Sequence, residues 1–288
     1  MKKITGVFTA LITPFQRGEV DFDSLRSLLR KQLDEGIQGF VVNGTTAESP
    51  CLSADERVEI FNYVKTEVAG QVPVIMGTGT NSTAETVSRT EEAAKLGAQA
   101  ALVVVPYYNK PPQQGLFAHF KSVAEHAQIP VILYNVPSRT IARLEIDTIL
   151  RLTKEKNIIG IKEASGDIHF ATKIKAGAPK EFSLLSGDDA SFAHFLNAGG
   201  DGIISVGSHI FAKEFVALQS REQGADKRFE ARLETINNLY LEANPIPVKM
   251  ALYLMGVIKS PEMRLPLTTM SEELLPKLKN SMTESGLI

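Results

Sequence analysis

Eight short apolar runs, separated by longer amphipathic stretches, constrain the fold of this chain more than any other feature. The runs lie at 7–12, 39–42, 74–76, 100–105, 131–134, 158–161, 182–185 and 202–206. Successive runs start 20 to 35 residues apart, which leaves room for a loop, a helix and a second loop. Because the runs are nearly continuous in apolar residues, they are typical of parallel strands buried on both faces.

The stretches between these runs have helical periodicity. One apolar stripe comprises Phe22, Leu25, Leu28, Leu29 and Leu33. Capping patterns predict further helix starts at Ser53, at Thr83 and at Asp188 or Asp189. Eight strand–helix units in succession predict an α/β fold, a closed (β/α)8 TIM barrel. A doubly wound open sheet is the alternative, and the absence of a dinucleotide fingerprint after the first run disfavours it.

The strand–helix alternation ends near Gln223. Helical patterns follow at 227–241, 248–257 and 271–281, with an Asn-Pro-Ile-Pro break before the second. We therefore predict a catalytic barrel over residues 1–224 and a C-terminal helical domain over residues 225–288.

Charge and cysteine content disfavour several classes of protein. The chain of 288 residues has 31 Lys and Arg against 33 Asp and Glu, a net charge of −2, which makes nucleic acid and anionic membranes poor partners. The lone Cys51 can form neither an internal disulfide nor a cysteine-based zinc site, as is typical of a reducing compartment. No apolar run approaches the ~18 residues of a membrane helix, and the N-terminus lacks a signal-peptide cleavage pattern. We expect a cytoplasmic protein.

Lys162 is the residue that most indicates chemistry. It follows the sixth apolar run, and catalytic groups of a barrel lie at the carboxyl ends of its strands. A lysine attacks a carbonyl only as the free amine, and its ordinary pKa near 10.4 leaves little amine at neutral pH. Burial in a barrel mouth would lower that pKa. The alternative is a lysine that reaches solvent from a strand end and pairs with Glu163 or Asp167.

Candidates for substrate handling follow the neighbouring runs. Tyr134 ends the fifth run, so its phenol could exchange a proton with the Lys162 amine, and the planar guanidinium of Arg139 suits a carboxylate. A core tyrosine and a surface arginine are the alternatives. Loops rich in glycine and hydroxyls at 43–49 and 77–82 could hold a carboxylate, or could be simple strand-to-helix turns. The five histidines form no H-x-H pair or cluster at strand ends, and we predict no metal site.

Six ordered motifs, spread over nearly the whole chain, resemble the pyruvate-dependent class I aldolases and lyases, a family that includes dihydrodipicolinate synthases and N-acetylneuraminate lyases. They are Gly-Thr-Thr-Ala-Glu-Ser at 44–49, Pro-Tyr-Tyr-Asn at 106–109, Tyr-Asn-Val-Pro-Ser-Arg-Thr at 134–140, Ile-Gly-Ile-Lys-Glu at 159–163, Ser-Gly-Asp-Asp at 186–189 and Asn-Pro-Ile-Pro-Val-Lys at 244–249. The threonine pair and Arg139 are similar to the synthase branch. That resemblance implies a lyase that condenses pyruvate with L-aspartate 4-semialdehyde in diaminopimelate and lysine biosynthesis.

The resemblance also implies catalytic roles. Lys162 would form a Schiff base with pyruvate, so no separate cofactor is needed. Tyr134, Thr45 and Tyr108 would form a proton relay, with Tyr108 supplied by a neighbouring subunit of a homotetramer built from two dimers. Thr46 would hold the pyruvate carboxylate.

Further residues follow from the same resemblance. Other substrate-binding residues would be Arg139, Gly187 and the carbonyl of Ile204. An allosteric lysine site would comprise Ser49, Asn81, Glu85 and Tyr107. Two departures stand out: Ala47 occupies a position that is glycine in most synthases, and Ala54 and Arg57 stand where inhibited members often have histidines.

Two other functions are compatible with parts of this pattern. A pyruvate lyase for a sugar acid, such as neuraminate or a 2-keto-3-deoxy acid, would share Lys162 and Tyr134 but would not need Arg139. A barrel that only binds a keto acid would have no need of a buried amine.

Overall fold

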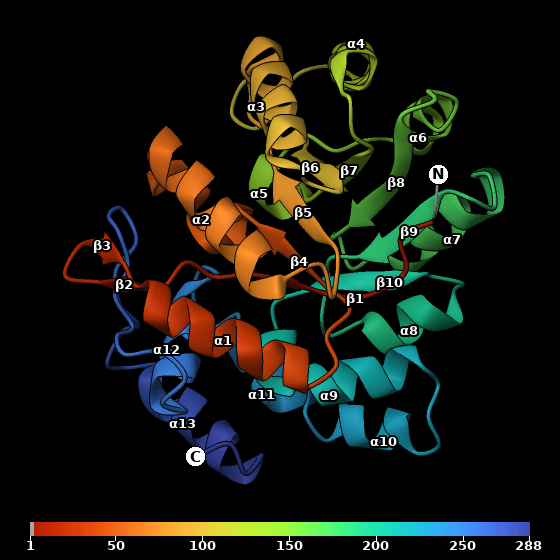
Figure 1. Cartoon of the computed structure of the whole chain (residues 1–288). Coiled ribbons are helices and arrows are strands. Elements are labelled where there is room, and N and C mark those ends of the chain that lie inside the picture. The colour runs from red at the N-terminus through yellow and green to blue at the C-terminus, as the bar shows by residue number, and fades with distance from the viewer. Residues whose placement is uncertain (1–2) are drawn as a thin grey trace. The chain divides into compact units, whose positions relative to one another are not determined.

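The computed structural model describes residues 3–288 (Figure 1). Within this range eight parallel strands form a closed barrel in the order β1, β10, β9, β8, β7, β6, β5, β4. Their bounds are Gly6–Ala10 (β1), Gly39–Val42 (β4), Val74–Gly77 (β5), Ala100–Val104 (β6), Val131–Asn135 (β7), Ile158–Glu163 (β8), Ser183–Ser186 (β9) and Gly202–Ser205 (β10). The predicted (β/α)8 barrel is confirmed, and the strand ends lie within two residues of the predicted ones.

The chain divides into two compact units. Unit 1 comprises residues 3–6 and Pro73–Ile204, and unit 2 comprises Val7–Val72 and Ser205–Ile288. The helices after residue 225 therefore group with the first part of the chain, and the boundary at 224 and 225 stays a prediction.

Unit 1 contains five successive strand–helix repeats (Figure 1). Its helices are Thr83–Leu96 (α3), Gln113–His126 (α4), Pro137–Thr140 (α5), Ile146–Leu152 (α6), Ile168–Gly177 (α7) and Phe192–Asn197 (α8). One hydrophobic cluster joins the strands to the helices that cover them; its members include Val103, Phe120, Leu133, Ile161 and Ile174. This apolar layer holds the strands in place, and with them the residues at their carboxyl ends.

Unit 2 contains most of β1, all of β4 and a second set of helices (Figure 1). Its helices are Phe22–Asp34 (α1), Ala54–Val68 (α2), Ser208–Gln219 (α9), Ala225–Glu230 (α10), Leu233–Asn238 (α11), Ile246–Leu254 (α12) and Leu275–Glu284 (α13). Two short 3-10 helices, Thr45–Ala47 (η1) and Ser49–Cys51 (η2), follow β4. A hairpin that the sequence did not predict pairs Phe15–Gln16 (β2) with Glu19–Val20 (β3). The helix predicted at 227–241 is two shorter helices.

Two of the predicted helix starts are confirmed. At α2 the Ser53 hydroxyl accepts from the Glu56 amide and the Ser53 amide donates to the Glu56 carboxylate, which is a complete capping box. Helix α3 begins at Thr83. The start predicted at Asp188 or Asp189 is wrong, because the Asp188 carboxylate accepts from the amide of Ser191 and so closes a turn that precedes α8.

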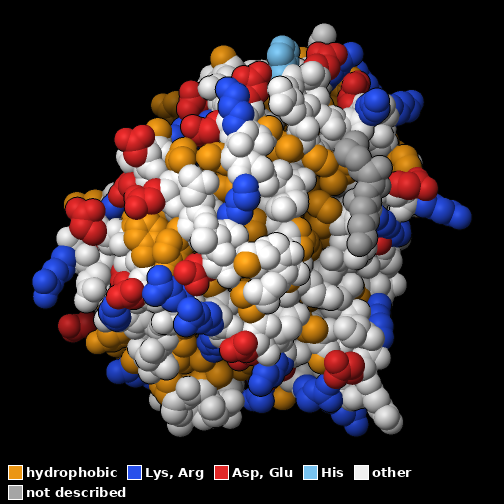
Figure 2. All heavy atoms as spheres, in the orientation of Figure 1, with side chains coloured by type: hydrophobic (Ala, Val, Ile, Leu, Met, Phe, Trp, Pro, Cys, Tyr) orange, Lys and Arg blue, Asp and Glu red, His pale blue; other side chains and the backbone are white. Residues whose placement is uncertain are grey.

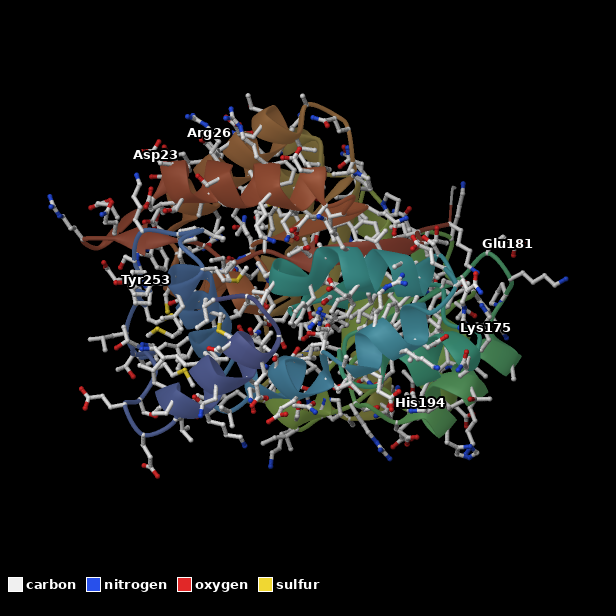
Figure 3. The ribbon with its side chains drawn as sticks, turned by 90° about the horizontal axis from the view of Figure 1, so that it is seen from below. Asp23, Arg26, Lys175, Glu181, His194 and Tyr253 are labelled. Atoms are coloured by element: carbon white, nitrogen blue, oxygen red, sulfur yellow. The ribbon has the colours of Figure 1, made fainter. Side chains whose placement is uncertain are left out.

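The face of the protein shown in Figure 2 is mixed in charge: acidic and basic side chains are interspersed, with apolar side chains between them. On α1, Asp23 and Arg26 lie on the outer side (Figure 3), where the Arg26 guanidinium donates to Glu67 at 3.1 Å. No helix within residues 3–288 is long and apolar enough to cross a membrane.

Candidate active site

Lys162 and Tyr134 lie side by side in unit 1. They are paired residues of the adjacent strands β8 and β7, and the Lys162 amine lies 4.4 Å from the centroid of the Tyr134 ring. Both side chains are buried, with 6% and 8% of their surfaces exposed. The ring face attracts a cation but offers no acceptor for its protons, so the amine sits in apolar surroundings.

Burial lowers the pKa of the Lys162 amine from its ordinary value to about 8. The negative charge of Asp189 acts against this shift, and the positive charge of Arg139 adds to it. A pKa of about 8 leaves about a tenth of the amine free at pH 7, a few hundred times more than the ordinary pKa would, and a nucleophilic lysine reacts through that free form.

The carboxylate of Glu163 does not serve as the partner of Lys162. One of its oxygens accepts from the Asn135 side-chain amide at 2.7 Å, and the other accepts from the Ser165 backbone amide at 2.7 Å. The Asn135 oxygen in turn accepts from the Leu144 amide at 3.0 Å. These bonds tie the end of β8 to the end of β7 and to the segment after α5. The alternative in which Lys162 pairs with Glu163 is therefore wrong.

Gly187 packs directly against the lysine side chain. A methyl group at this position would lie 2.7 Å from the Lys162 Cε and 2.5 Å from the Ala164 Cβ. Glycine, which has no Cβ, is therefore required here if the Lys162 side chain is to keep its observed position.

Arg139 and Ile204 also belong to unit 1. Arg139 is exposed on the one-turn helix α5, which starts at Pro137 directly after β7 and Val136. Its positive charge helps to lower the pKa of the Lys162 amine. Ile204 is buried in β10.

Thr45 and Thr46 lie in η1 of unit 2, directly after β4. The Thr46 hydroxyl accepts from the Asn244 side-chain amide at 2.9 Å, which leaves its own proton available for another acceptor. The Ala47 carbonyl accepts from the Thr13 hydroxyl at 2.9 Å. Ala47 belongs to the 3-10 helix, and the left-handed conformation falls on Glu48, with φ 55°. The extra methyl of Ala47 therefore does not sit on left-handed backbone.

The second glycine-rich loop, at 77–82, uses its hydroxyls internally. The Thr78 hydroxyl bonds Thr90 at 2.9 Å, and the Thr80 hydroxyl bonds Thr86 at 3.1 Å, both on α3. A methyl group at Gly79 would lie 2.4 Å from the Val104 backbone nitrogen, so the glycine permits close backbone packing. These contacts favour the interpretation of a strand-to-helix turn.

The remaining predicted residues lie in loops and at a helix start. Tyr108 is 89% exposed with φ 72°, beside the less exposed Tyr107. The Glu85 carboxylate accepts from Arg89 at 2.7 Å, and the Asn81 carbonyl accepts from Asn109 at 2.8 Å. Ser49 lies in η2 of unit 2. The allosteric assignment of these residues stays a prediction.

Sequence reasoning missed several polar residues that support the site. They are Asn135, Asp189, Asn244, Glu48 and Lys249, all buried. Each lies inside one of the six motifs, so its place in a motif could have marked it as a candidate. Three of them have partners far away in the chain: Asn244 bonds Thr46, 198 residues away, and Glu48 and Lys249 are 201 residues apart.

Comparison with known proteins identifies the family. The model of the dihydrodipicolinate synthetase family matches residues 3–285. A Bdellovibrio bacteriovorus protein named 4-hydroxy-tetrahydrodipicolinate synthase is 49% identical over 293 residues, with both chains fully covered. A solved structure of a monomeric dihydrodipicolinate synthase variant is 42% identical with a TM-score of 0.95, and the match covers 99% of this chain and 97% of that one.

A second solved structure is a chloride-inhibited dihydrodipicolinate synthase from Acinetobacter baumannii complexed with pyruvate. It is 39% identical with a TM-score of 0.95, over 99% of this chain and 100% of that one. Sequence and fold thus agree along the whole length of the chain. The chain belongs to the dihydrodipicolinate synthetase family.

Proposed function

We propose that this enzyme, a lyase of its family, condenses pyruvate with L-aspartate 4-semialdehyde through a Schiff base on Lys162. The observation that carries the proposal is the buried Lys162 amine at the end of β8, packed over the Tyr134 ring with its pKa lowered to about 8. The names of the relatives and the pyruvate complex of the Acinetobacter protein support the choice of substrates.

The first half of the reaction forms the nucleophile. The free amine of Lys162 adds to the keto carbon of pyruvate, and loss of water gives a protonated imine. The cationic imine nitrogen acidifies the neighbouring methyl group, and loss of one methyl proton gives an enamine. The Tyr134 phenol, beside the amine, suits the transfer of these protons. We assign Thr45 and Tyr108 to the same relay from the family resemblance.

The second half joins the substrates. The enamine carbon attacks the aldehyde carbon of the semialdehyde, whose oxygen takes up a proton. The semialdehyde's own amine then attacks the imine carbon, closes the ring and releases Lys162 as the free amine. The proton balance closes, and no redox cofactor is required.

Recognition of the substrates rests on their carboxylates. We assign the pyruvate carboxylate to Thr46, whose hydroxyl proton is left available by Asn244, and the semialdehyde carboxylate to the exposed guanidinium of Arg139. Gly187 and the Ile204 carbonyl would border bound pyruvate. A cytoplasmic homotetramer is the form we expect from the family resemblance and the lone cysteine.

Trapping with borohydride tests the proposal. The protein is incubated with pyruvate, reduced, digested and examined by mass spectrometry. We expect one modified peptide, with a 1-carboxyethyl group on the Lys162 amine, and no adduct in Lys162→Met. Lys175→Met, which removes a half-buried lysine of the same unit that pairs with Asp201, is the matched control and should be labelled like the wild type. Absence of an adduct on Lys162 would overturn the proposal.

The sugar-acid lyase is tested separately. Coupled assays with L-aspartate 4-semialdehyde and with neuraminate or a 2-keto-3-deoxy acid compare the two activities directly. We expect turnover only with the semialdehyde, and we expect Arg139→Ala to lose most of it while adduct formation with pyruvate persists. Cleavage of the sugar acid at a comparable rate would favour the lyase.

A further inference from the structure

A buried ion pair supports the turn that carries Thr45 and Thr46. The Lys249 amine on α12 donates to the Glu48 carboxylate at 2.5 Å, and neither side chain is exposed. The same amine donates to the Glu262 carbonyl at 2.9 Å and lies 4.2 Å from the centroid of the Phe15 ring. The second Glu48 oxygen accepts from the Arg264 amide at 2.9 Å. The Lys249 amine and both Glu48 carboxylate oxygens therefore have hydrogen-bond partners.

The pair acts on a strained point of the backbone. Glu48 adopts the left-handed conformation, with φ 55° and ψ 36°, and it separates the 3-10 helices η1 and η2. A residue with a Cβ pays a steric cost in this conformation, so surrounding contacts have to hold it there. Because the Glu48 side chain is anchored at both oxygens, the direction in which the preceding turn leaves β4 is fixed.

The contacts of the turn come from two separate segments of unit 2, one after β1 and the other at the start of α12. Thr13 bonds the Ala47 carbonyl, Asn244 bonds the Thr46 hydroxyl, and Lys249 bonds Glu48. Lys249 reaches the turn from buried α12, whereas Tyr253, one helical turn further on, lies at the surface (Figure 3).

Stability alone does not account for this pair. Removing two charges from water costs several kcal/mol per ion, and a buried pair often contributes no more than apolar residues of the same volume. Burial lowers the pKa of Lys249 to about 8, against the attraction of Glu48, so the amine is largely protonated at neutral pH. Unlike an apolar pair, the ion pair fixes the orientation of the Glu48 side chain, because each carboxylate oxygen accepts from a defined donor.

We propose that Lys249 and Glu48 are positioning residues for the binding of pyruvate, and that their bond sets the orientation of the Thr45–Ala47 turn toward the substrate carboxylate. The inference rests on the proposed function, because it assumes that this turn binds pyruvate. Neither residue touches the reacting atoms.

The test measures the pyruvate concentration that gives half-maximal borohydride-trapped adduct on Lys162. In Lys249→Met we expect this concentration to rise about tenfold or more, and the maximal trapping rate to stay within about threefold of wild type, since a displaced binding turn weakens binding and leaves the amine intact. Glu48→Gln keeps an oxygen for Lys249 and should raise the concentration less than Glu48→Leu does.

The double variant Glu48→Gln/Lys249→Met separates positioning from folding. It removes both charges, so it should melt at a higher temperature than Lys249→Met, which leaves Glu48 buried without its cation. Its half-saturating concentration should nevertheless stay raised. This variant also keeps the test decisive if Lys249→Met does not fold.

Two controls belong to the same unit. Lys259→Met removes a lysine and its exposed bond to Asp23, and Ile236→Ala lowers stability by emptying a core position on α11. Both should leave half-saturation within about twofold of wild type. The inference is overturned if the folded double variant needs the same pyruvate concentration for half-maximal trapping as wild type. It is also overturned if Ile236→Ala raises this concentration as much as Lys249→Met does. If wild type forms no adduct, the proposed function itself fails.

Discussion

The amine of Lys162 is subject to three influences that differ in sign. Burial lowers its pKa, the Arg139 guanidinium lowers it further, and the Asp189 carboxylate raises it. Asp189 is itself almost fully buried, so solvent screens its charge weakly. The pKa of about 8 is thus a balance that single substitutions can tip in either direction.

The pH dependence of adduct formation should follow this balance. Below the pKa the amine is a cation and cannot attack, so the trapping rate of wild type should rise with pH and level off above about 8. Asp189→Asn removes the group that raises the pKa, and its profile should move to lower pH. Arg139→Met removes a group that lowers it, and its profile should move to higher pH. The measurement is the initial trapping rate between pH 6 and 10 at a fixed pyruvate concentration well below half-saturation, where the profile reports the pKa of the free protein. Shifts in the same direction would contradict the assignment.

Gly187 tests the packing around the same amine. In Gly187→Ala the new methyl would overlap the Lys162 Cε and the Ala164 Cβ, and the Ala164 Cβ is fixed to the backbone and cannot rotate away. We expect the trapping rate to fall by about tenfold or more, since small displacements of a reacting group are costly. Gly115→Ala on α4 is the matched control, because the new methyl comes no closer than 3.4 Å to its neighbours. It should trap like wild type. Equal rates in all three proteins would show that the lysine can move aside.

Among the elements, the strands were the most predictable from sequence. Parallel strands buried on both faces appear as continuous apolar runs, and all eight runs became strands. The β2–β3 hairpin was not predictable, since two-residue strands are too short for any alternation to be recognised. Lys162 and Tyr134 could be found because they end adjacent strands. Lys249 and Glu48 could not, because only the folded chain brings residues 201 positions apart together.

Helix α9 carries a histidine that links its start to β1. The ring of His209 is fully buried; its Nε2 accepts from the Ile12 amide at 3.2 Å and its Nδ1 lies 2.8 Å from the Val206 carbonyl. An acceptor at Nε2 and a donor at Nδ1 define one neutral tautomer. Protonation would replace the acceptor by a donor that faces the Ile12 amide.

This histidine should make the fold sensitive to acid. Burial lowers the pKa of His209 from 6.5 to about 4, so between these values the unfolded chain binds a proton that the folded chain does not. Its contribution to stability is therefore present above pH 6.5 and is lost as the pH falls toward 4. We expect a loss of about 2 kcal/mol between pH 7 and pH 5 from this group.

Urea unfolding at pH 7 and pH 5 measures the effect of His209. His209→Met should be less stable than wild type at pH 7 by about 1–3 kcal/mol, because the Ile12 amide loses its partner, but it should lose less stability on going to pH 5. His126→Gln, at an exposed histidine of α4, should keep the pH dependence of wild type. An unchanged pH dependence in His209→Met would refute the assignment.

At the scale of the whole molecule, a nearly neutral protein is expected to handle small anionic acids. The net charge of −2 leaves no general attraction for anions, so the cationic groups have to be local. In the proposed mechanism Lys162 and Arg139 supply that local charge, and the Thr45–Ala47 turn supplies hydroxyls. One proposed catalytic group lacks the buried surroundings of Lys162 and Tyr134: the Tyr108 side chain is 89% exposed. An exposed phenol is a poor proton relay within its own chain.

Mixing two defective variants tests whether Tyr108 acts across subunits. A hybrid dimer contains one Lys162→Ala chain and one Tyr108→Phe chain. If each site takes its lysine from one chain and its tyrosine from the other, one of the two sites in the hybrid has both residues. If dimers re-form at random, the mixture should regain up to about a quarter of wild-type turnover after dissociation and reassociation. Each variant alone, treated in the same way, gives the baseline. A mixture that stays at the average of the two baselines while hybrids are detected by native mass spectrometry would place Tyr108 in its own chain's site, and would remove the reason for a subunit-shared relay.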